Sequence, residues 1–135
     1  LLRRLTPGAY NKRERMRHML TSKEIAHLAV KALDDKLARD IQILKTDKVT
    51  VLADYFILCT AGNSTHGKTL ADEVDKVLSQ AGEQPLRREG YRSGGWTLLD
   101  FGCVVVHIFS EEMRSFYSLD RLWSDAEKID YKDFL

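Results

Sequence analysis

The residues best suited to chemistry do not form a complete reaction centre. Gly62-Asn63-Ser64 joins an expected strand to an expected helix, where free backbone amides can hold a phosphate. A nucleotidyl transferase would also need paired carboxylates on a nearby strand to hold magnesium. Asp72, Glu73 and Asp75 fall instead within the expected helix, where solvation is their simplest role. The turn also lacks the Walker lysine and the GxGxxG spacing, so an ordinary helix N-cap is favoured over a nucleotide site.

Two further candidates have simpler explanations than catalysis. Asp100-Phe101-Gly102 matches the magnesium-binding triplet of protein kinases, but no glycine-rich loop, strand lysine or catalytic loop accompanies it. We therefore interpret it as a hairpin turn. His107 alternates with Val106 and Ile108, which favours a hydrogen-bonded histidine in the core or at its rim over a catalytic base. The pattern predicts a protein that is not an enzyme and that uses neither a metal nor a cofactor.

The elements that must position these residues can be read from periodicity. Thr21-Ser22-Lys23-Glu24 has the capping-box pattern and predicts a helix over about 22–38. Strands are expected around 41–43 and 55–59, and a second helix runs from the turn at 62–65 to near residue 82. An edge strand at 85–89, a hairpin of 96–100 with 103–109, and a helix capped by Ser110 follow. The order αββαβββα predicts an α/β (α+β) domain, a mixed five-stranded sheet with flanking helices.

Length and charge suggest one domain with a distinct leader. The chain has 135 residues, of which 44% are hydrophobic and 30% charged, enough for one core. Residues 1–20 carry six basic and one acidic side chain, a balance of +5, and the rest carries −4. An acidic body repels phosphate backbones, so sequence-specific nucleic-acid binding is not expected. We expect a flexible basic extension over 1–20, a domain over 21–125 and a polar, fraying tail over 126–135.

The leader and the cysteines bear on the compartment. The leader is compatible with an RNA-contacting arm, a transit-peptide remnant or an upstream extension, and the last is favoured. Cys59 and Cys103 lie in apolar runs without CxxC spacing, which predicts buried free thiols in a reducing compartment. No apolar run reaches the roughly 18 residues of a membrane span. The expected location is the cytoplasm, with an organelle as the alternative.

The segment 116–123 suggests a partner surface. It holds five large apolar or aromatic side chains in eight residues, more than one short helix turns inward on one face. The alternative is that Leu119, Leu122 and Trp123 only complete the core. Nearby acidic side chains would complement a basic partner; they are Glu111, Glu112, Asp120 and Asp125.

Taken together, eight short motifs give the chain a family resemblance. It resembles the Iojap family, the ribosomal silencing factors called RsfS in bacteria, over about residues 22 to 125. The motifs occur in unbroken order: Asp40-Ile41, Ala53-Asp54-Tyr55-Phe56, Gly62-Asn63-Ser64-Thr65-His66, Glu89-Gly90, Gly95-Trp96, Asp100-Phe101-Gly102, Val105-Val106-His107 and Tyr117-Ser118-Leu119-Asp120-Arg121-Leu122-Trp123. The leader of residues 1–20 is not part of this pattern.

The resemblance implies a docking protein that represses translation. Such a protein binds the large ribosomal subunit through its L-fourteen family protein and sterically blocks the small subunit; organelle relatives act in large-subunit assembly. The implied fold is a nucleotidyltransferase-like core without catalytic carboxylates, and a homodimer off the ribosome is implied as well. The alternatives kept are an organelle assembly factor and a residual nucleotide-binding enzyme. The implied partner-binding residues are Trp96, Asp100, Glu111, Glu112, Arg114, Tyr117, Leu119, Leu122 and Trp123.

Overall fold

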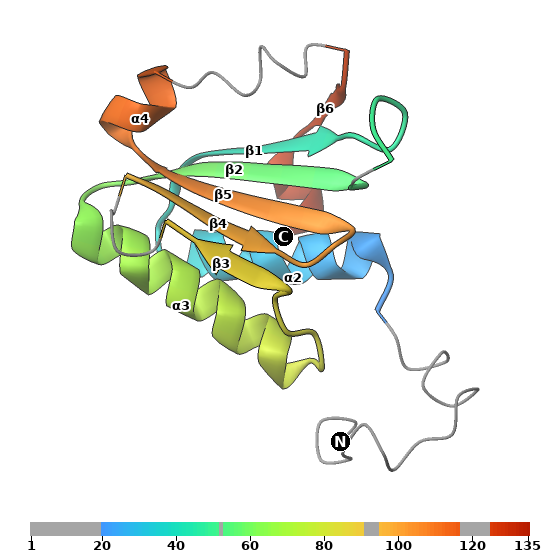
Figure 1. Ribbon diagram of the computed structural model, residues 1–135, viewed down its shortest axis with the longest axis horizontal. Helices are drawn as coiled ribbons and strands as arrows, with labels where there is room; N and C mark the ends of the chain where they lie inside the picture. The colour runs from blue at the N-terminus through green and yellow to red at the C-terminus, as the bar shows by residue number, and fades with distance from the viewer. Residues whose placement is uncertain (1–19, 52, 91–94, 117–124) are drawn as a thin grey trace.

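A mixed sheet with two helices on one face forms the body of the protein (Figure 1). The computed structural model describes residues 20–51, 53–90, 95–116 and 125–135. In these residues six strands have the order β3-β4-β5-β2-β1-β6. The elements are α2 (Ser22–Asp35), β1 (Arg39–Lys45), β2 (Tyr55–Ala61), α3 (Ser64–Gln80), β3 (Arg87–Glu89), β4 (Trp96–Asp100), β5 (Val104–Ser110), α4 (Glu111–Phe116), β6 (Glu127–Ile129) and a 3-10 helix, Tyr131–Phe134.

The parallel pair β2 and β5 forms the centre of the sheet because both strands are apolar on both faces. On one face Ile57, Val104 and Val106 pack under α2 and α3 in the main core. On the other face Leu58 and Phe109, both fully buried, form a second and smaller cluster. The β4–β5 hairpin turns at Gly102, whose positive φ of 86° suits glycine.

Local signals set the starts of both long helices. Thr21 and Glu24 form the predicted capping box, with bonds of 2.9 and 3.1 Å to each other's backbone amides. Asn63 caps α3 by accepting a bond from the His66 amide. Within the described part of the chain, no helix combines the length and apolar character that crossing a bilayer requires.

The C-terminal segment differs from the expectation of a polar, fraying tail over 126–135. Glu127–Ile129 pairs antiparallel with β1 as the strand β6, which makes the sheet six-stranded instead of five-stranded. Phe134 is only 4% exposed and contacts Tyr55 edge-on, with ring centroids 5.7 Å apart. The segment is held because its few apolar side chains reach the main core, although its composition is polar.

Two of the three acidic residues of α3 are ion-paired rather than simply solvated. Arg88 on β3 bonds Asp75 at 2.7 Å and Asp72 at 3.2 Å. The two carboxylates therefore hold the helix to the sheet edge. Cys59 and Cys103 are free thiols, as predicted, although Cys103 is only half-buried. Burial raises the pKa of the Cys59 thiol to about 12, which keeps it protonated.

Candidate docking surface

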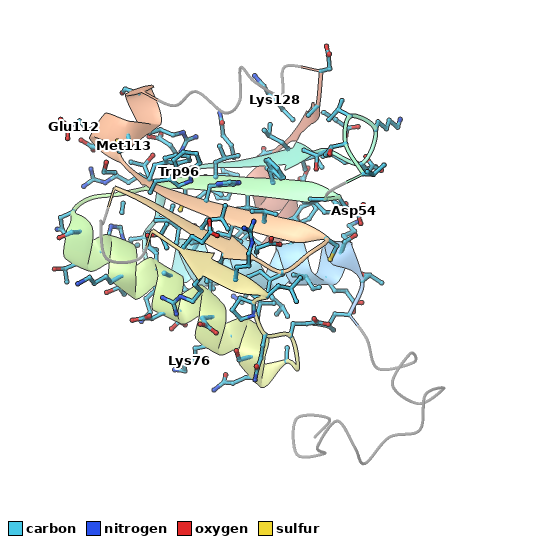
Figure 2. The ribbon with its side chains drawn as sticks, viewed as in Figure 1. Asp54, Lys76, Trp96, Glu112, Met113 and Lys128 are labelled. Atoms are coloured by element: carbon cyan, nitrogen blue, oxygen red, sulfur yellow. The ribbon has the colours of Figure 1, made fainter. Side chains whose placement is uncertain are left out.

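Four of the predicted partner-binding residues lie at one end of the sheet. Trp96 begins β4, and Glu111, Glu112 and Arg114 belong to α4, which follows β5 directly. Met113 of α4 packs in the same cluster as Trp96 (Figure 2). The Ser110 amide also donates to the Gly95 carbonyl at 2.9 Å. This end of the molecule, defined by Trp96 and residues 111–114, is called the α4 surface below.

The other predicted residues do not join this group within the described chain. Asp100 ends β4, about 13 Å from Trp96 at roughly 3.3 Å per residue, and it bonds Arg87 at 3.2 Å and the Gly102 amide at 2.8 Å. It therefore shapes the hairpin. The remaining predicted anchors lie outside the described residues; they are Tyr117, Leu119, Leu122 and Trp123.

Trp96 is held by a buried histidine. Its indole Nε1 donates to Nδ1 of His107 at 3.1 Å, and the ring centroids of Trp96 and Phe109 lie 5.1 Å apart. Burial lowers the pKa of His107 to about 4, and the Asp100 carboxylate only partly opposes this. Because Nδ1 accepts, the proton of the neutral ring is on Nε2. The prediction of a hydrogen-bonded histidine is right for Nδ1 and wrong for Nε2, which is buried without a partner among the described residues.

Two arginines attach α4 to the sheet. Arg39 Nη1 bonds Glu111 Oε1 at 2.6 Å, between side chains that are both largely exposed. Arg114 turns inward, donating from Nη1 to Thr60 Oγ1 at 3.1 Å and from Nη2 to the Asp40 carbonyl at 3.1 Å. Its Nη2 also lies 3.2 Å from the side-chain oxygen of Gln42 on β1. Glu112 remains exposed.

The turn before α3 uses its own side chains where a phosphate would have to bind. The Gly62 amide donates to His66 Nδ1 at 2.8 Å, and the His66 amide donates to Asn63 Oδ1 at 2.8 Å. His66 Nε2 then donates to the Lys36 carbonyl at 2.7 Å, joining the start of α3 to the end of α2. The N-cap interpretation is confirmed, and the role of His66 was missed. Its position three residues after Asn63 was the available signal.

The described residues contain no cluster of side chains suited to binding a metal ion. No group of three or more histidine, cysteine or acidic side chains there has the geometry to hold an ion. The strongest candidates, Asp72 and Asp75, are paired with Arg88.

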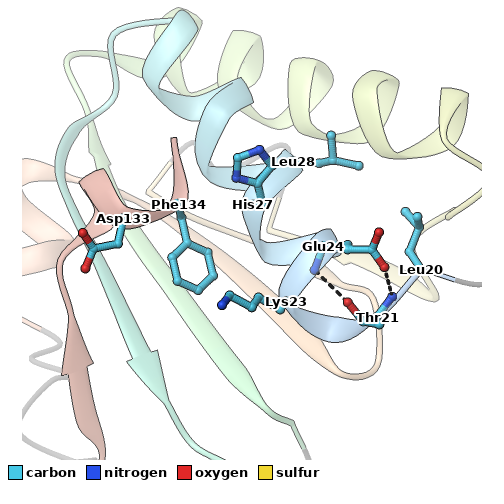
Figure 3. A pocket seen from close by; sticks show the side chains of 8 residues that line it. All are labelled: Leu20, Thr21, Lys23, Glu24, His27, Leu28, Asp133 and Phe134. Carbon is cyan, nitrogen blue, oxygen red and sulfur yellow. Dashed lines mark hydrogen bonds between the residues drawn. The ribbon is translucent and has the colours of Figure 1, made fainter.

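A pocket of about 490 Å³ lies at the start of α2, at the opposite end of the molecule from α4 (Figures 1 and 3). Phe134 faces Lys23 and His27 across it, and the Thr21–Glu24 capping box forms its rim (Figure 3). The backbone amide of Thr21 lowers the pKa of Glu24, which is engaged in that cap. Its position at the other end of the molecule separates this pocket from the α4 surface.

Comparison with known proteins agrees with the motifs. Residues 19–135 match the family model "Ribosomal silencing factor during starvation". The ribosomal silencing factor RsfS of Halalkalibacterium halodurans is 35% identical over 111 residues, covering 82% of this chain and 95% of that protein. The chloroplastic protein Iojap of Zea mays is 31% identical over 103 residues, covering 74% of this chain and 43% of Iojap.

A solved structure supports the same assignment. The crystal structure of a Chromobacterium violaceum protein superimposes with a TM-score of 0.76 at 37% identity, covering 78% of this chain and 88% of that one. The predicted mixed α/β class is confirmed, while the nucleotidyltransferase-like core stays a prediction. From the family model over residues 19–135 and the relatives that match along most of its length, this chain belongs to the ribosomal silencing factor (RsfS) family.

Proposed function

We propose that this chain represses translation by binding the large ribosomal subunit and keeping the small subunit away. Membership of the RsfS family carries a ribosome-associated silencing role. The finer proposal is that the contact is made with the ribosomal protein of the L-fourteen family, and that the block is steric. The observation that carries the silencing role is the family match over residues 19–135.

The chemistry of the α4 surface suits a basic protein partner. Glu112 is exposed next to the half-buried, apolar Trp96 and Met113, and the exposed Glu111 beside it is paired with Arg39. Negative charge at the rim of an apolar patch steers association and sets orientation, while the apolar side chains supply most of the affinity. We therefore propose that the contact is made at this end; the predicted anchors Tyr117 and Trp123 lie outside the described residues.

The mechanism is competition for a surface. A patch of about 800 Å² on each partner is enough for stable docking, so no turnover is required. Repression should follow occupancy of the large subunit and saturate at one protein for each subunit. A homodimer formed through the same surface would compete with docking and lower the effective concentration.

The test uses purified ribosomal subunits. The two subunits are mixed with and without the protein and separated on a sucrose gradient. We expect the joined-ribosome peak to fall and the protein to migrate with the large subunit. Full joining of the subunits in a saturating excess of protein would refute the proposal. Pull-down with the isolated L-fourteen family protein then separates this contact from others on the same subunit.

A second candidate is a large-subunit assembly factor in an organelle. It is favoured by the chloroplastic relative Iojap and by the +5 charge of residues 1–20. The two candidates differ in timing and compartment: an assembly factor sediments with precursors of the large subunit, and a silencing factor with mature subunits. For the silencing role, the proposed compartment is the cytoplasm.

A further inference from the structure

The short helix α4 depends on contacts outside itself. It has six residues, fewer than an isolated helix needs to be stable in water. The Ser110 hydroxyl caps its start by accepting from the Met113 amide at 3.1 Å. Its orientation relative to the sheet must come from tertiary contacts, and Arg114 makes three of them.

Arg114 joins two strands at once. Its guanidinium bonds Thr60 on β2 and reaches Asp40 and Gln42 on β1. The register between β1 and β2 shifts between Arg39 and Gln42, and Asp40 has a positive φ of 49°. An irregularity of this kind turns a backbone carbonyl out of the regular ladder, and here the Asp40 carbonyl accepts from Arg114.

The contacts of Arg114 use both terminal nitrogens of its planar guanidinium group. Nη1 bonds Thr60, while Nη2 meets Asp40 and Gln42; lysine has one nitrogen on a flexible stem in place of this planar pair, so we expect Arg114→Lys to lose the arrangement. Thr60 is 2% exposed, so its hydroxyl is out of reach of any partner. The exposed Arg39–Glu111 pair is screened by solvent and contributes less to the position of the helix.

We infer that Arg114 is a positioning residue, which acts on docking by holding α4 against β1 and β2 and not by touching the ribosome. This inference rests on the proposed function and replaces the expectation that Arg114 is a polar contact to the partner. Without the clamp, α4 samples other orientations, and only the fraction in the correct one can dock. A smaller competent fraction lowers the apparent association rate constant and leaves dissociation from the formed complex unchanged.

The test measures association and dissociation rate constants on immobilised large subunits. Arg114→Lys is expected to associate about ten-fold slower with the same dissociation rate, since a tenth of the chains would be competent. Thr60→Val alone should associate about three-fold slower. It should add nothing in the Arg114→Lys background, because the bond that it removes is one of the three that Arg114→Lys already breaks. Arg88→Ala is the matched control: it removes an arginine clamp between β3 and α3 and should keep the wild-type rates.

The outcomes separate the two levels of inference. Faster dissociation with normal association would make Arg114 a direct contact and overturn the positioning role. Three other results would also overturn it. The association rate constant of the double variant could fall by the product of the two single effects, the folded Thr60→Val chain could associate at the wild-type rate, or Arg88→Ala could slow association as much as Arg114→Lys. If the wild-type chain does not bind large subunits, the proposed function itself is wrong, and the positioning role falls with it.

Discussion

Acid should destabilise the fold through His107, and replacing this residue should remove the effect. The ring is buried between Phe56 and Phe109 with Trp96 donating to Nδ1, so the folded protein holds it neutral with a pKa of about 4. The unfolded chain has the ordinary value of 6.5. As the pH falls below 6.5, the unfolded state binds a proton that the folded state does not bind until the pH is near 4. The free energy of unfolding therefore decreases as the pH falls through this range.

The magnitude follows from the difference between the two pKa values. One pH unit of difference corresponds to about 1.4 kcal/mol, so the full loss, reached below pH 4, is about 3 kcal/mol. Between pH 7 and pH 5 the expected loss is about 2 kcal/mol. Above pH 7 this histidine should have almost no effect on the pH dependence of stability.

Urea denaturation at pH 7 and pH 5 measures the effect. His107→Phe keeps an aromatic ring and cannot titrate, so its free energy of unfolding should drop by about 2 kcal/mol less than that of the wild type between the two pH values. His27→Gln, on the half-buried side of α2, is the control and should keep the wild-type drop. An equal drop in wild type and His107→Phe would refute the assignment of a neutral, buried His107.

Three further predictions test the core, the docking surface and the nucleotide alternative. Phe134→Ala should lower the free energy of unfolding by about 3 kcal/mol or more in urea denaturation. The free energy of unfolding of the control Lys132→Ala, at an exposed position, should stay within about 0.5 kcal/mol of the wild type. Equal stabilities of the two variants would favour the sequence-based prediction of a fraying tail. Tyr117→Ala or Trp123→Ala should weaken large-subunit binding by about 2 kcal/mol, and unchanged co-sedimentation of a folded double variant contradicts the assigned anchors. Calorimetry with nucleoside triphosphate and magnesium should give no heat, because the Gly62 and His66 amides are already bonded to side chains of the turn. Saturable heat would support the enzyme alternative.

Elements with a local code were predictable from the sequence. The capping box at Thr21 and Glu24 fixed the start of α2, and the glycine turn at 102 fixed the hairpin of β4 and β5. The strand β6 was not predictable in this way, because two of its three residues are charged and its pairing depends on β1, far away in the chain.

The candidate site was predictable only in part, for a similar reason. The partner role of Arg114 is implied by the family resemblance and stays a prediction. A six-residue helix is too short for periodicity to tell which side chains face inward, so the bonds of Arg114 to the sheet were not predicted. Its acceptors on β1 and β2 are 54 to 74 positions away. The bonds from Arg88 to α3 likewise span 13 and 16 positions and leave no mark on local sequence.

The two outer strands limit how copies of the protein can meet. Both β3 and β6 have three residues. All three residues of β3 are charged, and so are two of the three in β6. Short, charged borders oppose the backbone-to-backbone joining by which many sheets continue from one molecule into the next. Pairing of two copies is therefore expected to involve side chains on a face of the molecule. Such a dimer would dissociate when another partner binds the same face.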